Sequence, residues 1–171
     1  MTFKSAGHMR RFFISGCQRS GTTMLRLVLE SHPGIQCFDE AVGYELMVRE
    51  ARGEEQGAMP TKAGASLLGF KVPRFAEQLT WREFSDPAYG MLPSFYKGEK
   101  VIHIVRDVLD VVGSMMKLKA AAGASWLETY GLRILGDIIN HPNVDESYKM
   151  KYNDIERQGL PLHLVGALYW E

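Results

Sequence analysis

The sequence lacks an apolar run that approaches the roughly 18 residues of a membrane-spanning helix. It also lacks the long apolar core of a secretory signal peptide near its N-terminus. The chain also lacks an excess of charge of either sign, because 20 Lys and Arg residues balance 20 Asp and Glu residues. We therefore expect neither a nucleic-acid partner nor a membrane partner, and we expect a cytoplasmic location.

Cysteine is scarce, since Cys17 and Cys37 are the two in the chain. Two cysteines make no disulfide framework of the kind that holds small secreted domains together. A disulfide between neighbouring strands stays open as an alternative, but the pattern favours two reduced thiols in a reducing compartment.

The rest of the composition is typical of a globular protein, with 46% hydrophobic and 23% charged residues among 171. This length suits one domain with a sizeable core. Because Ser5–Met9 resemble a vector junction, we treat residues 1–9 as a tag remnant or a disordered N-terminus. We assign residues 10–171 to one domain. The chain stops within a helical pattern, LVGALYWE, so we expect a domain that is incomplete at its C-terminal side.

Short apolar runs alternate along the chain with segments of helical periodicity. Strands are predicted at residues 11–15, 35–38, 67–72 and 100–105, and helices at residues 22–30, 42–51, 75–84, 86–96, 108–119, within 124–139 and over 160–171. This alternation predicts an α/β fold, a three-layer P-loop-type domain with a central, mostly parallel sheet flanked by helices. Ligands bind such sheets at the carboxyl ends of the strands, where residues 16–23, 38–40 and 106–107 lie.

The segment GCQRSGTT lies between the first predicted strand and the first predicted helix. Backbone N–H groups of such a loop can point inward at the positive end of the helix, an arrangement that binds anions. Arg19 adds a charge that stays protonated. We therefore expect the whole loop to bind a phosphate-type group, namely Gly16, Cys17, Gln18, Arg19, Ser20, Gly21, Thr22 and Thr23.

The loop lacks the lysine of nucleotide-hydrolysing P-loops, because Thr22 stands in its place. That lysine contacts the β- and γ-phosphates of a nucleotide, while a Ser or Thr and a carboxylate hold magnesium. No predicted strand ends in a well-placed Asp, and Asp107 is better explained as a helix N-cap. The pattern favours a metal-free ligand with one 5′-phosphoryl-type group over ATP with magnesium.

A second element begins at the end of the fourth predicted strand. Arg106 leaves that strand, and Ser114 follows eight residues later in the next helix. The axial rise between them is at most about 12 Å, which an Arg side chain and a phosphate can bridge. Taken alone, these residues favour a simpler interpretation, in which Arg106 pairs with a carboxylate and Ser114 packs.

The two segments GCQRSGTT and VRDVLDVVGS together resemble the paired signatures of sulfotransferases that use 3′-phosphoadenosine 5′-phosphosulfate (PAPS). The resemblance spans roughly residues 11–118. In that family the first signature binds the 5′-phosphosulfate, which implies this role for residues 19–23. The second binds the 3′-phosphate, which implies that role for Arg106 and Ser114. PAPS is thus implied as co-substrate, without a metal.

Within that family, SHPGIQCFDE and GFKVPRF are most similar to the tyrosylprotein-sulfotransferase-like and bacterial branch. The resemblance implies that Glu40 is the general base and that Lys71 stabilises the reacting sulfuryl group. Asp39 is the reserve base, and a surface carboxylate at a helix start is the alternative for Glu40. Arg19 is expected to stabilise charge rather than to donate a proton.

The resemblance implies transfer of a sulfuryl group from PAPS to a hydroxyl or amine acceptor by in-line displacement. Carbohydrate, peptide tyrosine, lipid and small phenol or alcohol acceptors are all compatible, and no pattern indicates an oligomeric state. The alternatives are a P-loop nucleotide or small-molecule kinase and a non-catalytic nucleotide-binding module. His103 is expected in the core, and Trp81, Trp126 and Trp170 either line an acceptor pocket or pack.

Overall fold

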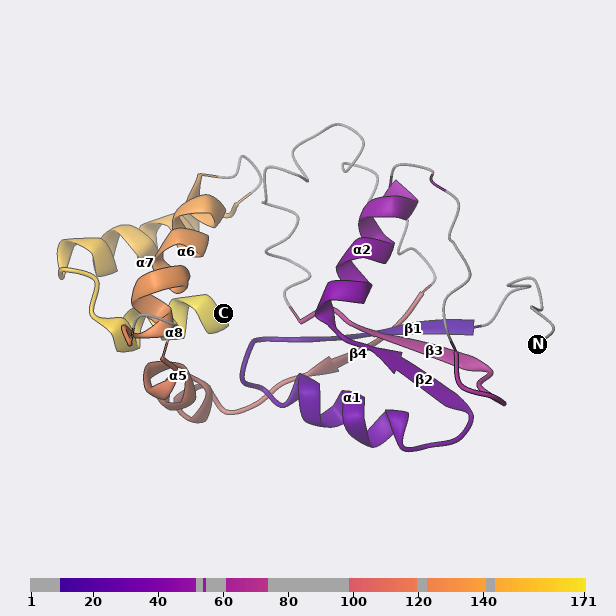
Figure 1. Ribbon diagram of the computed structural model, residues 1–171. Coiled ribbons are helices and arrows are strands. Elements are labelled where there is room, and N and C mark those ends of the chain that lie inside the picture. The colour runs from indigo at the N-terminus through magenta and orange to yellow at the C-terminus, as the bar shows by residue number, and fades with distance from the viewer. Residues whose placement is uncertain (1–9, 52–53, 55–60, 74–98, 120–122, 141–143) are drawn as a thin grey trace. The chain divides into compact units, whose positions relative to one another are not determined.

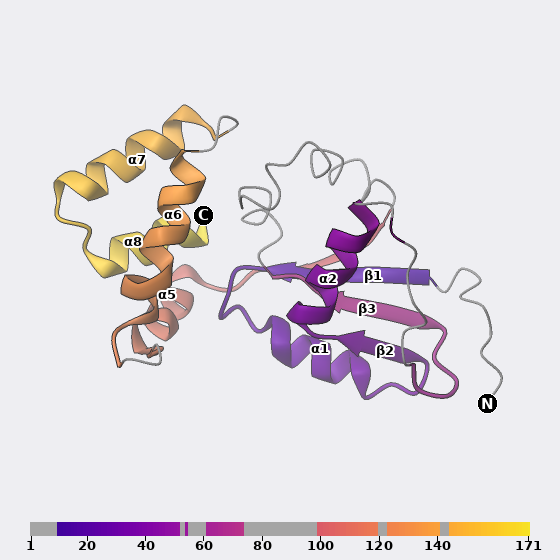
Figure 2. The ribbon, with the colours of Figure 1, turned by 45° about the horizontal axis from the view of Figure 1, so that its top comes forward.

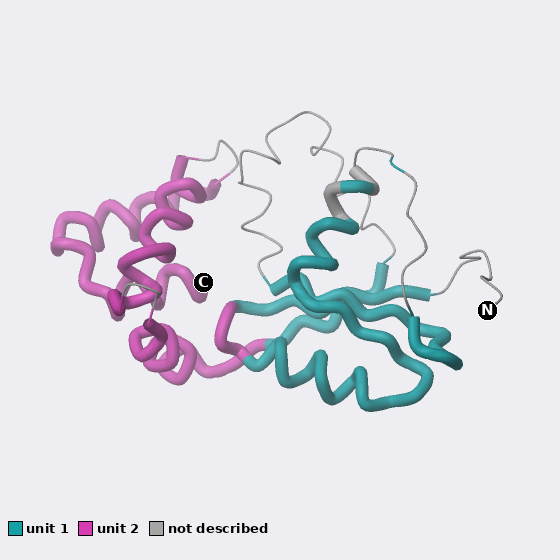
Figure 3. The backbone as a smooth tube through the Cα atoms, viewed as in Figure 1, with its two compact units in different colours: residues 1–17, 21–104 teal, residues 18–20, 105–171 magenta. Residues whose placement is uncertain are grey.

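The computed structural model describes residues 10–51, 54, 61–73, 99–119, 123–140 and 144–171 (Figure 1). The predicted tag remnant and the helices predicted at 75–84 and 86–96 lie outside these residues. The chain divides into two compact units, coloured separately in Figure 3. Unit 1 comprises residues 1–17 and 21–104, and unit 2 comprises residues 18–20 and 105–171. The assignment of residues 10–171 to one domain stays a prediction.

A four-stranded parallel sheet with the strand order β2-β3-β1-β4 forms the centre of unit 1. Its strands are β1 (Arg10–Gly16), β2 (Ile35–Phe38), β3 (Leu67–Lys71) and β4 (Lys100–Ile104). Each observed end lies within one residue of the predicted one. Because the strands are parallel, their carboxyl ends lie at one edge of the sheet, as the sequence predicts.

Helices α1 (Thr22–Glu30) and α2 (Glu40–Ala51) connect the strands of unit 1. The connection from β1 through α1 to β2 and the return through α2 to β3 run in opposite directions across the sheet. Right-handed crossovers then require the two helices to lie on opposite faces, as Figures 1 and 2 show. The predicted α/β fold, with a parallel sheet flanked by helices, is confirmed.

One face of the sheet packs against helix α1. Phe12 and Ile14 of β1 form a buried cluster with Cys37 of β2, and Leu25 and Leu29 of α1 pack against it. These α1 residues are four apart and therefore lie on one side of the helix. Full burial of a leucine side chain contributes about 1.5–3 kcal/mol to folding, and Leu25 and Leu29 contribute less because they are partly buried.

Gly69 of β3 lies in register between Phe12 and Cys37. A Cβ atom at Gly69 would lie 2.5 Å from the Phe12 ring and 2.7 Å from Cys37 Sγ. A residue with a side chain would therefore displace the cluster, so this position of the sheet requires glycine.

The other face of the sheet carries aromatic side chains in register. The ring centroids of Phe13 and Phe70 are 5.8 Å apart, and those of Phe70 and Phe38 are 5.3 Å apart. Phe13 and Phe70 are almost fully buried. Cross-strand aromatic contacts of this kind stabilise a sheet beyond the burial of area.

Strand β4 is exposed, in contrast to the prediction for its histidine. It is the last strand in the described sheet, and Val101, Ile102 and His103 are all exposed. The expectation that His103 belongs to the core is wrong, because an apolar run in the sequence does not distinguish an edge strand from a central one.

Unit 2 is helical. Its elements are α5 (Val108–Lys117), the π-helix η3 (Leu127–Gly131), α6 (Leu132–Ile139), α7 (Glu146–Arg157) and α8 (Leu162–Trp170). The Asp107 carboxylate accepts hydrogen bonds from the backbone N–H groups of Leu109 and Asp110, so Asp107 is the N-cap of α5 as predicted.

Helix α8 packs closely on α5. A Cβ atom at Gly166 of α8 would lie 3.2 Å from a methyl group of Val112 in α5 and 3.2 Å from one of Leu127 in η3. Glycine thus lets the three elements approach one another. Val165 and Leu168 of α8 are buried at the same contact. The helical pattern predicted over residues 160–171 is confirmed, although the helix is buried on most sides rather than on one.

Helix α7 is not predicted by the sequence pattern. Its apolar side chains Tyr148, Tyr152 and Ile155 follow a helical spacing but are only half-buried, and none of residues 146–157, all of them described, is buried. The signal that marks it is the cap, since the Asp145 carboxylate accepts a hydrogen bond from the Ser147 backbone N–H. Hydrogen bonding by Ser147 lowers the pKa of Asp145. Among the helices of the described ranges, none combines the length and apolarity needed to cross a bilayer.

Candidate functional site

The chain leaves β1 at Gly16, where the predicted phosphate loop begins. Gly16 has a φ of 149°, and a Cβ atom there would lie 2.5 Å from the Ile104 carbonyl oxygen. Only glycine fits this close approach of β1 and β4. The first glycine of the motif therefore has a structural reason that is independent of any ligand.

The end of the loop shapes the start of helix α1. Gly21, the N-cap residue, has a φ of 103°, and Arg19 has a φ of 69°, which is uncommon for a residue with a side chain. The first turn of α1, all of it described, has neither a side-chain cap nor an acidic residue. The first N–H groups of a helix lack intrahelical partners. This helix start is therefore suited to an anion.

Ser20 gives a second indication of a ligand. Its side chain is buried, with 7% exposure of the residue, and its hydroxyl has no hydrogen-bond partner within the described residues. A buried hydroxyl without a partner costs about 1–3 kcal/mol. An anionic oxygen bound at the loop would satisfy it, so this residue fits the predicted phosphosulfate ligand.

Residues from both predicted signatures lie together in unit 2. The Arg19 Nε donates a hydrogen bond to Ser114 Oγ at 3.0 Å, and Arg106 Nη1 donates one to the Arg19 carbonyl oxygen at 3.3 Å. We call Arg19, Arg106 and Ser114 the arginine cluster. Two guanidinium groups and a hydroxyl provide donors for anionic oxygens and hold no negative charge of their own.

A carboxylate pairs with the arginine cluster. Asp110 Oδ2 lies 3.2 Å from Arg106 Nη2 and also accepts from Arg106 Nε at 3.4 Å. The side chains of Arg106 and Asp110 are 45% and 62% exposed. Arg106 thus pairs with a carboxylate, as the simpler interpretation has it, whereas Ser114 accepts a hydrogen bond from Arg19 and does not merely pack. Exposed ion pairs contribute only about 0–1 kcal/mol.

The predicted catalytic pair lies in unit 1, at the carboxyl ends of β2 and β3. Lys71 Nζ is 2.9 Å from Glu40 Oε2, with side-chain exposures of 10% and 34%. Gly43 brings α2 close to β3, because a Cβ atom there would lie 3.0 Å from the Lys71 carbonyl oxygen. The structure therefore joins two residues that the sequence predicts separately, in a partly buried ion pair.

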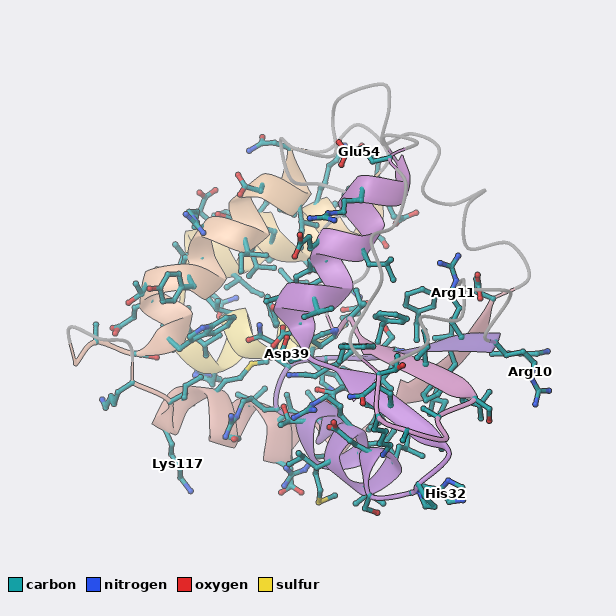
Figure 4. The ribbon with its side chains drawn as sticks, turned by 45° about the vertical axis from the view of Figure 1, so that its right-hand side comes forward. Arg10, Arg11, His32, Asp39, Glu54 and Lys117 are labelled. Atoms are coloured by element: carbon teal, nitrogen blue, oxygen red, sulfur yellow. The ribbon has the colours of Figure 1, made fainter. Side chains whose placement is uncertain are left out.

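Asp39, the predicted reserve base, is exposed at the start of α2, where Figure 4 labels it. Its carboxylate accepts a long hydrogen bond, 3.4 Å, from the backbone N–H of Val42. Lys117 and Lys119, after Ser114, are also exposed, and Figure 4 shows the Lys117 side chain extending away from α5. A solvated position accounts for both lysines.

One of the predicted tryptophans packs against a tyrosine of α8. Trp126 packs edge-on against Tyr169 at 5.6 Å between centroids, whereas Trp81 lies outside the described residues.

Cys17 and Cys37 both lie in the described part and are not joined by a disulfide. Burial, with a contribution from the Glu30 charge, raises the pKa of the Cys37 thiol. Cys37 is therefore a core residue rather than a nucleophile.

Two residues that contact Arg106 are not among the predicted site residues. Asp110 is recognisable from its position four residues after Arg106 in a predicted helix. Trp170 donates a hydrogen bond from its indole Nε1 to the Arg106 carbonyl oxygen at 3.1 Å. No sequence signal marks this contact, because 64 residues separate its partners.

The described residues contain no group of three or more His, Cys, Asp or Glu side chains that would hold a metal ion, and the metal-free site stays a prediction.

A search of curated protein sequences finds no match. The model of a sulfotransferase family matches residues 11–83. This range includes the loop at residues 16–23 together with Glu40 and Lys71, and it ends before Arg106. The match confirms the predicted resemblance to a sulfotransferase family for residues 11–83, and the branch within that family stays a prediction.

Proposed function

We propose that this protein transfers a sulfuryl group from PAPS to a hydroxyl or amine acceptor. The observation that carries the proposal is the arginine cluster, in which residues from two distant segments lie within hydrogen-bond distance. The sulfotransferase-family match supports sulfuryl transfer in general. PAPS as the donor and the roles of the individual residues are part of the proposal and go beyond that match.

The reaction is an in-line displacement at sulfur. An acceptor oxygen or nitrogen forms a bond to sulfur while the bond from sulfur to the bridging oxygen breaks. The electron pair of that bond leaves with 3′-phosphoadenosine 5′-phosphate. Negative charge grows on the bridging oxygen and on the sulfuryl oxygens, so fixed donors at these atoms lower the barrier.

The loop at residues 16–23 supplies those donors. Its backbone N–H groups and the Ser20 hydroxyl bind the 5′-phosphosulfate, which provides a partner for the buried hydroxyl. Arg19 stabilises the charge that develops during transfer. Because a guanidinium does not give up its proton at usable pH, the Arg19 role is electrostatic.

Arg106 and Ser114 bind the 3′-phosphate. Arg106 pairs with Asp110 when no nucleotide is bound, and the exposure of this pair makes it weak. A phosphate carries more charge than a carboxylate and accepts bidentate hydrogen bonds from arginine. The 3′-phosphate therefore displaces Asp110 from Arg106 at small cost.

Glu40 removes the proton of the acceptor as it attacks sulfur. Lys71, in contact with Glu40, fixes the orientation of the carboxylate and adds positive charge for the sulfuryl oxygens. A carboxylate in the first turn of a helix is also favoured by the helix dipole. Glu40 thus stays in place without an acceptor.

Calorimetric titration tests the proposal directly. The protein is titrated with 3′-phosphoadenosine 5′-phosphate without metal, and with ADP and ATP in the presence of magnesium. We expect the 3′-phosphorylated nucleotide to bind most tightly, and we expect Arg19→Ala and Arg106→Ala to weaken it. Arg157→Ala is the matched control, because Arg157 is exposed in unit 2 and pairs with Asp154 on its own helix. Tighter binding of ATP with magnesium would replace the proposal with a P-loop kinase.

A further inference from the structure

Arg106 lies in the short segment between β4 and α5. Residues 105–107 belong to neither a helix nor a strand. Arg106 directly precedes Asp107, the N-cap of α5. Its carbonyl oxygen nevertheless has a defined partner, because Trp170 Nε1 donates a hydrogen bond to it at 3.1 Å. The last turn of α8 therefore contacts the residue that is proposed to bind the 3′-phosphate.

Helix α8 is a firm support for this contact. Gly166 lets α8 approach Val112 of α5, and Leu168 is buried. The Tyr148 hydroxyl of α7 also donates a hydrogen bond to the Leu168 carbonyl oxygen at 2.8 Å, but this bond joins α8 to α7 and not to α5. Trp170 thus extends from a helix that packing holds against α5, and it fixes the main chain of Arg106 relative to α5.

The side chain of Arg106 is held as well. Asp110 accepts from its Nη2 and Nε, and the Arg19 carbonyl oxygen accepts from its Nη1. Arg106 therefore connects Trp170 to the loop residue Arg19. A shift of the Arg106 main chain would move the guanidinium and also remove a hydrogen bond from Arg19, whose backbone has a positive φ.

We propose that Trp170 is a positioning residue, which holds the Arg106 main chain so that its guanidinium meets the 3′-phosphate of the nucleotide. The inference rests on the proposed function. Trp170 contacts neither phosphate in this account and acts through Arg106. Its loss should therefore change the selectivity for a 3′-phosphate rather than the affinity for nucleotides in general.

The test compares two variants that each remove one hydrogen bond to or from α8. Trp170→Phe keeps an aromatic ring but removes the indole N–H. Tyr148→Phe, the matched control, removes the bond to Leu168 and leaves Arg106 untouched. The measured quantity is the ratio of the metal-free affinities for 3′-phosphoadenosine 5′-phosphate and adenosine 5′-phosphate. We expect Trp170→Phe to lower this ratio about two- to tenfold, the effect of one hydrogen bond, and Tyr148→Phe to leave it unchanged.

The outcomes separate this inference from the function on which it rests. If the unaltered protein does not prefer the 3′-phosphorylated nucleotide, both are overturned. If it does, but Trp170→Phe keeps the same ratio as Tyr148→Phe, the Trp170 role alone is overturned. A lower melting temperature with an unchanged ratio would likewise assign Trp170 a purely structural role.

A second measurement covers the case in which Trp170→Phe does not fold. The indole N–H resonances of the unaltered protein are recorded by nitrogen-15 NMR, and Trp81→Phe and Trp126→Phe identify the other two. We expect the Trp170 resonance to shift more with 3′-phosphoadenosine 5′-phosphate than with adenosine 5′-phosphate. Equal shifts with both nucleotides would contradict the inference.

Discussion

Two ion pairs in this protein join a basic side chain to a carboxylate, and they differ in burial and in origin. The pair of Lys71 and Glu40 joins the ends of two neighbouring strands in unit 1 and is partly buried. The pair of Arg106 and Asp110 in unit 2 is exposed, and it joins the residue before the N-cap of α5 to the first turn of that helix. The first depends on the fold, whereas the second forms from a local spacing of four residues.

Because of this difference in burial, we call the pair of Lys71 and Glu40 the permanent pair and the pair of Arg106 and Asp110 the exchangeable pair. Removing one partner of a buried pair leaves a charge with little solvent, which costs up to about 3–5 kcal/mol. An exposed pair contributes about 0–1 kcal/mol and is easily replaced by a ligand phosphate. In the proposed function the permanent pair fixes a catalytic carboxylate, and the exchangeable pair keeps a binding arginine in place until the nucleotide arrives.

The largest effect is expected when the carboxylate of the permanent pair is changed. Glu40→Gln should lower turnover of PAPS with a phenol or alcohol acceptor by roughly 10²–10⁴, because it removes the general base. Binding of 3′-phosphoadenosine 5′-phosphate should be unchanged. Glu45→Gln is the control, since Glu45 lies on the same helix in an exposed pair with Arg49. Full turnover by Glu40→Gln would return Glu40 to a structural role.

The next effect concerns the charge that the arginine cluster provides at the loop. Arg19→Ala should lower turnover by about 10²–10³, the usual cost of one donor to a developing negative charge. Arg19→Lys should restore only part of it, because an ammonium lacks the planar donor geometry of a guanidinium. Initial rates at saturating PAPS measure both variants. Equal rates for Arg19→Lys and the unaltered protein would reduce the role of Arg19 to a point charge.

A stability measurement compares the two pairs directly. Lys71→Met should lower the free energy of unfolding by about 2–4 kcal/mol, below the full cost of a buried pair because Glu40 is partly exposed. Arg106→Met should change it by less than about 1 kcal/mol. Urea unfolding followed by circular dichroism gives both values. Equal losses in the two variants would remove the distinction between a permanent and an exchangeable pair.

The smallest effect is expected at the partner that the nucleotide displaces. Asp110→Asn should tighten metal-free binding of 3′-phosphoadenosine 5′-phosphate by about two- to fivefold at low salt, since an exposed pair contributes at most about 1 kcal/mol. The gain should shrink as salt screens the exposed charges. Weaker binding in Asp110→Asn would mean that Asp110 orients Arg106 rather than competes with the phosphate.

Much of the fold is visible in the sequence because the determining patterns are local. The strands and helix α1 follow from apolar runs of the right length beside glycine, and Asp107 marks the start of α5. Helix α7 escapes prediction because it buries no residue. The exposure of His103 escapes as well, since the sequence does not reveal the position of β4 at the sheet edge.

In the candidate site, too, the features with a local sequence pattern are predictable, and the contacts that depend on the fold are not. The residues of the arginine cluster are marked by two sequence segments, and Asp110 follows Arg106 by four residues. The contact between Lys71 and Glu40 depends on the order of β2 and β3 in the sheet, which the sequence does not state. The Trp170 contact depends on how α8 packs on α5, so only the structure reveals it.

The most direct test of the central claim is the preference for a 3′-phosphate. The affinities for 3′-phosphoadenosine 5′-phosphate and adenosine 5′-phosphate are measured without metal in the unaltered protein, in Arg106→Ala and in the control Arg157→Ala. The account predicts a clear preference for the 3′-phosphorylated nucleotide that Arg106→Ala abolishes and Arg157→Ala retains. Equal affinities in the unaltered protein, or a preference that survives Arg106→Ala, would contradict it.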